Sequence, residues 1–116
     1  DVAYLLIPDK AQLLEESTRK MLAYYNLDSS QFNPMITTEI FSQVALELNV
    51  KFADVKNQMM LLPNKPEFYY IADNHFTPKG HRIYSKLVAP FLHEFLTVED
   101  TTETGVVFTD RTQPQD

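Results

Sequence analysis

The 116 residues suffice for one globular domain and are too few for two. The lack of cysteine excludes disulfides, thiolate metal sites and a cysteine nucleophile. The net charge of −6, which is concentrated from Glu99 onward, leaves no basic stripe of the kind that binds nucleic acid. The apolar runs are too short for a transmembrane segment and no signal-peptide pattern is present, so the sequence assigns no compartment.

The first predicted strand covers Val2 to Pro8, a continuous apolar run without alternation. Such a run is typical of a strand that is buried on both faces, as in a parallel sheet. Asp9 can cap a helix, and the apolar spacing after it predicts one helix over 10–25. Because a buried strand stands at the very start, we expect the same domain to have sequence upstream of Asp1.

A second helix is predicted to begin at Asn33-Pro34 and to end near Asn49, because asparagine caps helices and proline suits the first helical position. Its apolar stripe, which predicts the face toward the core, consists of Ile36, Ile40, Phe41, Val44 and Leu48. The alternating segment 50–55 predicts a second strand, and 57–66 a loop.

A third helix is predicted from Thr77-Pro78, and Pro90 is expected to kink or split it. Residues 98–116 are expected to form an acidic tail, with a small strand at 106–108 as the alternative. The order of these elements predicts an α/β fold with parallel strands. Since two strands cannot bury three amphipathic helices, we expect either an absent N-terminal part or a second copy of the chain to complete the sheet.

Asp73 and His75 are the candidate catalytic residues. They stand two positions apart in a predicted extended loop, a spacing that places both side chains on the same side. A carboxylate that binds one ring nitrogen of a histidine fixes its tautomer and stabilises its protonated form, which prepares the other nitrogen to act as a base. The alternative is that Asp73 only caps the turn.

The block DNHFTPKGH lies between an apolar segment and an amphipathic helix, and it resembles the last conserved block of the SGNH (GDSL-type) hydrolases. The single residue between acid and base is similar to the branch that includes bacterial polysaccharide O-acetyltransferases and related esterases. The segments VAYLLIPDKAQLL and LNVKFADV resemble two core strands of that branch. The resemblance covers residues 2–96 and carries three segments in the same order.

This resemblance implies a three-layer α/β/α flavodoxin-like fold, of which residues 1–97 would be the C-terminal part. It also implies a serine esterase or O-acyltransferase that acts on small acyl esters, such as O-acetylated glycans, without cofactor or metal. Asp73 would orient His75, and His75 would be the base. The nucleophile would lie in an absent N-terminal block, because the strand-then-turn setting that exposes a nucleophilic serine is missing at Ser17, Ser29, Ser30, Ser42 and Ser85.

Other histidines are weaker candidates. His81 falls in the first turn of the third helix and is interpreted as a surface residue, and His93 has no motif around it. Asp73, His75 and His81 contain the oxygen and imidazole donors that suit zinc, but no fourth ligand has a recognisable spacing. The sequence therefore predicts no metal site.

The remaining features have structural interpretations. Asp54, at the end of the second strand, could be another acid, but the resemblance implies a structural role for it. The basic side of the third helix is interpreted as a solvated face: Lys79, Arg82 and Lys86. The aromatic residues around the loop are interpreted as core rather than as a sugar-stacking surface: Phe68, Tyr69, Tyr70 and Phe76. The alternative function is a non-enzymatic α/β binding or assembly module.

Overall fold

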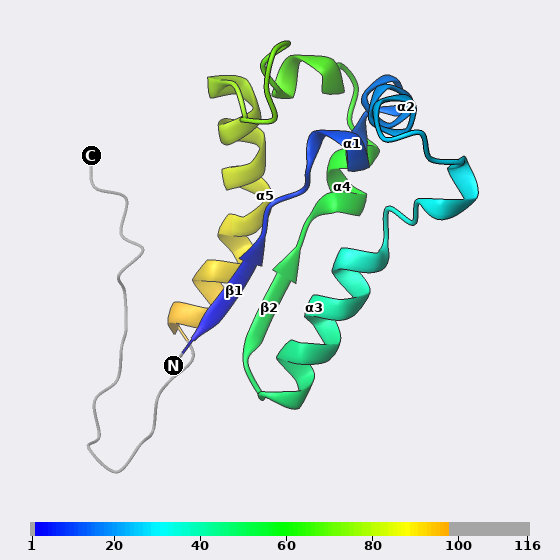
Figure 1. Ribbon diagram of the computed structural model, residues 1–116. Helices are drawn as coiled ribbons and strands as arrows, with labels where there is room; N and C mark the ends of the chain where they lie inside the picture. Colours follow the sequence, from blue (N-terminus) through cyan, green and yellow to red (C-terminus); the bar gives the residue numbers. More distant parts are fainter. Residues whose placement is uncertain (1, 98–116) are drawn as a thin grey trace.

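The computed structural model describes residues 2–97; the expected acidic tail, with its 106–108 segment, lies outside the described residues. The elements, shown in Figure 1, are β1 (Ala3–Leu6), α1 (Lys10–Leu13), α2 (Glu15–Tyr24), η1 (Ser29–Gln31), α3 (Ile36–Glu47), β2 (Lys51–Asp54), α4 (Lys56–Met60), η2 (Lys65–Phe68) and α5 (Pro78–Thr97). No helix within the described part is long and apolar enough to cross a membrane.

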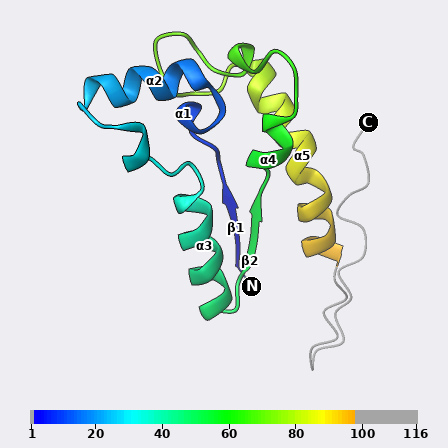
Figure 2. The ribbon, with the colours of Figure 1, turned by 90° about the vertical axis from the view of Figure 1, so that its right-hand side faces the viewer.

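The two strands pair in parallel, with Tyr4 opposite Phe52, and Figure 2 shows α3 on one side of them and α5 on the other. This confirms the predicted mixed α/β fold with parallel strands. The expectation that the first strand is buried on both faces is wrong for residues 2–97, because Tyr4 and Leu5 are exposed by 46% and 38%. Their exposure follows from a sheet of only two strands in the described residues.

The hydrophobic core lies where the strands end, between α1, α4, η2 and α5. It consists of Leu13, Val55, Met59, Phe68, Tyr69, Phe76, Tyr84 and Val88. Two of its tyrosines are hydrogen-bonded to the end of β1: the Tyr69 hydroxyl donates to the carbonyl of Pro8 at 2.6 Å, and the Tyr84 hydroxyl donates to that of Leu6 at 3.2 Å. The first strand is thereby fixed to the C-terminal half of the chain.

The helix predicted over 10–25 is interrupted at Leu14, whose backbone is extended (φ −117°, ψ 114°). Leu13 is buried in the core and Leu14 packs against it. The Thr18 hydroxyl donates to the carbonyl of Ala11 and, at 3.2 Å, to that of Leu14. The Leu14 carbonyl also accepts the backbone N–H of Thr18 at 3.0 Å, so the particular contribution of the hydroxyl is a partner for the Ala11 carbonyl where the chain turns between α1 and α2.

The prediction of a loop over 57–66 is wrong, because this segment contains most of α4 and the start of η2. The Asp54 carboxylate accepts the backbone N–H of Lys56 at 2.8 Å and so organises the start of α4. Met59 is completely buried and holds this short helix against the core. Lys56 is the other buried residue of α4, and two buried positions in a helix of five residues leave too little periodicity to be recognised in the sequence.

The last helix begins as predicted, since the Thr77 hydroxyl accepts the N–H of Gly80 at 3.2 Å. α5 continues through Pro90, so of the two expected effects of this proline, a kink or a split, the split does not occur. Proline leaves the carbonyl four residues earlier, that of Lys86, without its helical partner. Both residues are exposed, so water can solvate that carbonyl.

The predicted apolar stripe on α3 is not buried within residues 2–97. Only Ala45 of this helix is buried. The exposed fraction is between 41% and 61% for each of the stripe residues Ile36, Ile40, Phe41, Val44 and Leu48. The helix is present where the sequence predicts it, but the surface on which its stripe would pack is not supplied by the described residues.

Candidate functional site

The candidate site is on a loop that leaves the core and returns to it. Tyr69 and Phe76 form an isolated antiparallel bridge at its base, and their rings are 4.9 Å apart. One step further out, the N–H of Tyr70 donates to the carbonyl of His75 at 3.1 Å. The base of the loop is therefore fixed in the core, while its tip is exposed.

The structure brings Asp73 and His75 together at this tip. Oδ1 of Asp73 lies 3.3 Å from Nδ1 of His75, and the same oxygen accepts the backbone N–H of His75 at 2.8 Å. The carboxylate thus both caps the turn and faces the imidazole, a geometry that is compatible with either interpretation of the sequence. The contact at Nδ1 leaves Nε2 as the ring nitrogen available to a substrate. The side chain of Asp73 is 52% exposed and that of His75 is 86% exposed.

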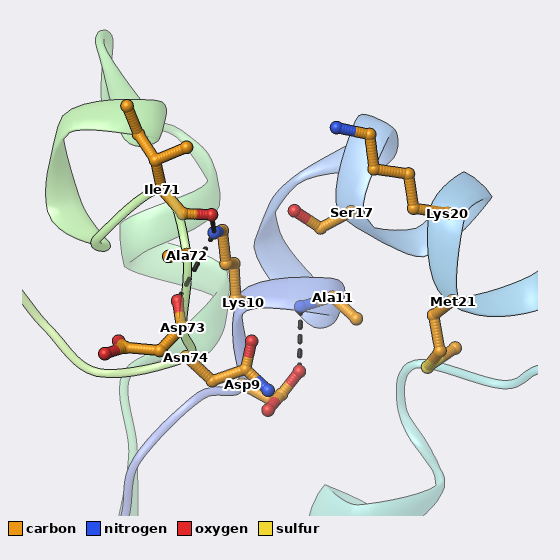
Figure 3. Close-up of a pocket in the computed structure, with 10 residues that line it drawn as sticks. All are labelled: Asp9, Lys10, Ala11, Ser17, Lys20, Met21, Ile71, Ala72, Asp73 and Asn74. Carbon is orange, nitrogen blue, oxygen red and sulfur yellow. Dashed lines mark hydrogen bonds between the residues drawn. The ribbon is translucent and has the colours of Figure 1, made fainter. Parts of the chain in front are cut away.

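A cavity of about 220 Å³ lies beside the loop, between the β1–α1 turn and α2 (Figure 3). Its polar lining consists of Asp9, Lys10, Ser17, Lys20, Asp73 and Asn74. Figure 3 shows the Ser17 hydroxyl on the cavity side and the Asp73 carboxylate turned away from it. His75 does not line this cavity. The structure therefore does not bring Ser17 together with Asp73 and His75 as a catalytic triad.

Lys10, the lysine after the proline-containing turn in a segment that carries the family resemblance, is a residue of the site to which the sequence interpretation gave no role. Its ammonium group donates to the carbonyls of Tyr70, Ile71 and Asp73 at 2.7, 3.1 and 3.3 Å. Sixty residues separate it from the nearest of these partners along the chain. The only signal in the sequence is its place directly after the Pro-Asp turn that ends the first strand.

The Thr-Pro-Lys-Gly segment has a structural role at the C-terminal side of the loop. The Thr77 hydroxyl donates to the carbonyl of Glu67 at 2.6 Å while it accepts the N–H of Gly80. A Cβ atom on Gly80 would lie 2.1 Å from the carbonyl oxygen of Phe68, so only glycine fits there. This segment fixes the entry of α5 against η2.

The other candidates have structural positions. His81 is exposed with its ring edge-on to Phe76 at 5.5 Å, and His93 is exposed on α5. Residues 2–97 contain no group of three His, Cys, Asp or Glu side chains that could hold a metal ion. Asp54 accepts the hydroxyl of Thr38, which agrees with its structural interpretation.

The aromatic residues around the loop divide into two groups. Phe68, Tyr69 and Phe76 are buried, which confirms their interpretation as core residues. Tyr70 is 49% exposed and is not part of the core, so its prediction as a core residue is wrong. Its backbone rather than its side chain supports the loop.

No family model, curated protein or solved structure matches the chain. The resemblance to the SGNH hydrolases is therefore a prediction from three sequence segments. The functional interpretation depends on the geometry of the loop itself.

Proposed function

We propose that this chain is the C-terminal part of a serine esterase or O-acyltransferase of the SGNH type, and that it supplies the catalytic acid and base. The observation that carries this proposal is the 3.3 Å contact between Oδ1 of Asp73 and Nδ1 of His75. The pair lies on a loop with a fixed base and an exposed tip, where a second part of the protein could reach it.

In the proposed mechanism, a serine from the N-terminal part attacks the carbonyl of a small acyl ester. Nε2 of His75 takes the serine proton and then gives it to the departing alcohol, while Asp73 holds the imidazole and stabilises its protonated form. Donors of the N-terminal part bind the oxyanion. O-acetyl groups on a glycan are the substrate class that we favour, and this mechanism needs no cofactor or metal.

The fold proposed for the whole domain is the three-layer α/β/α flavodoxin-like arrangement. The positions of α3 and α5 on opposite sides of a parallel strand pair support it. The exposed stripe of α3 and the exposed residues of β1 also support it, because further strands and helices would cover them. The same added part would shield His75, which is 86% exposed here, from water.

The test is a polypeptide extended toward its N terminus, assayed on an aryl acetate. His75→Ala is expected to lower kcat by at least about 10³-fold, and Asp73→Asn by roughly 10²- to 10⁴-fold, because both remove support for serine deprotonation. His93→Ala is the matched control, since His93 is exposed on α5 without a motif, and it should change kcat less than about twofold. Full activity of the His75→Ala variant would rule out the assignment.

A second candidate is a non-enzymatic binding or assembly module. It is favoured by the bond from the His75 N–H to Asp73, which gives the carboxylate a structural task besides its contact with the ring. In that case the extended polypeptide shows no turnover of aryl acetate. A stable monomer formed by the 116-residue chain alone would also favour this candidate.

A further inference from the structure

Lys10 holds the loop through three backbone carbonyls at once. It is the first residue of α1, and its ammonium group donates to the carbonyls of Tyr70, Ile71 and Asp73 at 2.7, 3.1 and 3.3 Å. Figure 3 draws the contacts with Ile71 and Asp73. A lysine ammonium has three N–H donors, so one donor is available for each carbonyl. Three carbonyl oxygens that converge on one point repel one another unless a cation lies between them.

The contacts of Lys10 leave the Asp73 carboxylate free for His75. The ammonium binds the backbone oxygen of Asp73, whereas Oδ1 binds the backbone N–H and faces the ring of His75. The turn between β1 and α1, which carries Lys10, makes a second contact with the loop: the Tyr69 hydroxyl donates to the carbonyl of Pro8. The end of β1 is thus tied to both the base and the tip of the loop.

We propose that Lys10 is a positioning residue for the Asp73–His75 pair. By fixing the carbonyls of residues 70, 71 and 73 it sets the backbone path on which the carboxylate meets Nδ1. The importance of this positioning for catalysis rests on the proposed function. The geometric part concerns only the loop and is measurable in the chain itself.

The test removes the charge of Lys10 and observes the imidazole of His75. In the ¹⁵N-labelled 116-residue chain, the wild type should show neutral His75 enriched in the tautomer with the proton on Nδ1. Lys10→Met should shift this signature toward that of a free histidine and speed hydrogen exchange of the Tyr70 N–H by about tenfold. Lys20→Met is the matched control, because Lys20 lines the same cavity but pairs with Glu16.

A chemical rescue separates positioning from general damage to the fold. The chain has no cysteine, so Lys10→Cys provides a single thiol. Alkylation of the denatured variant with 2-bromoethylamine restores a lysine-like ammonium, and 1-bromopropane gives a neutral side chain of similar size. After refolding, only the amine adduct should recover the wild-type imidazole signature and the slow exchange of Tyr70.

The outcomes separate the two proposals. Wild-type readouts in Lys10→Met, or equal behaviour of the two adducts, would overturn the positioning role while leaving the esterase proposal standing. An extended polypeptide without esterase activity, together with a shifted His75 signature in Lys10→Met, would overturn the proposed function and keep Lys10 as the residue that orders the loop.

Discussion

At the scale of single residues, Gly80 shows how a local motif can have a purely structural cause. Its Cα lies so close to η2 that an added Cβ would be 2.1 Å from the carbonyl oxygen of Phe68 and 2.9 Å from the ring of Phe76. Glycine in a helix is ordinarily less favourable than alanine by about 1 kcal/mol. The sequence alone would therefore suggest that alanine stabilises α5 here, whereas the packing requires the opposite.

We expect Gly80→Ala to lower the free energy of unfolding by about 2–4 kcal/mol, because the backbone of η2 must move to make room. Urea denaturation followed by circular dichroism measures it. Ser85→Ala, at an exposed position of the same helix, should change stability by less than about 0.5 kcal/mol. An unchanged or higher stability of Gly80→Ala would contradict the close approach.

Tyr69 gives the protein a predicted sensitivity to alkaline pH. Burial, and secondarily the carboxylate of Asp9, raises the pKa of the Tyr69 phenol well above its usual value. In the unfolded chain the phenol loses its proton near pH 10, while in the folded chain it stays protonated. Because the unfolded state releases this proton at a lower pH than the folded state does, deprotonation favours unfolding. The contribution of the buried, protonated phenol to the free energy of unfolding is therefore fully present below about pH 10 and is lost as the pH rises further.

Tyr69→Phe separates the hydrogen bond of this side chain from the effect of its buried, ionisable phenol on stability. At pH 7 the variant should be less stable by about 1–2 kcal/mol, because the hydrogen bond to Pro8 is lost. Between pH 9 and pH 11 it should lose less stability than the wild type, because it has no buried phenol at this position. Tyr24→Phe, at a position that is 82% exposed, is the control for urea unfolding at each pH. Parallel losses in wild type and Tyr69→Phe would refute the role of this phenol.

The proximity of Asp73 and His75 was predictable because it is local. Only Asn74 separates them, and an extended turn is enough to bring the carboxylate to the ring. Lys10 was not predictable in the same way, since its bonds join segments about 60 residues apart and involve backbone oxygens only. Such contacts leave no pattern in the types of the partner residues.

At the scale of elements, those with local end signals were predicted well. The start of α5 has a threonine cap followed by proline, and Asn33 accepts the N–H of Met35 at 2.9 Å just before α3. The break at Leu14 has neither glycine nor proline, and it is maintained by the Thr18 hydroxyl and by core packing. Tertiary interactions determine a break of this kind. The apolar periodicity alone therefore predicted one helix where the structure has α1 and α2.

The exposed stripe of α3 connects the element scale to that of the whole molecule. A helix with one apolar face gains most of its stability from burial of that face. In residues 2–97 the stripe of α3 is largely exposed to water. Tyr4 and Leu5 of β1 are also exposed, and the segment from Val2 to Ile7 has no charged side chain. Natural sheet edges are usually protected by charge, proline or a covering element. This combination is what we expect if β1 and α3 lie in the interior of the proposed larger domain.

We therefore expect the isolated 116-residue chain to self-associate in a concentration-dependent way, which size-exclusion chromatography with light scattering would measure. The double variant Ile40→Gln/Phe41→Gln should reduce the association and the binding of an apolar dye. It should cost at most about 1–3 kcal/mol of stability, because these side chains are 53% and 45% exposed and only about half of each is removed from water. The matched control is Gln43→Asn on the same helix, which should leave both readouts unchanged. A chain that is monomeric at every concentration would mean that the two-stranded fold is self-sufficient, and the reason for expecting a further part of the domain would be lost.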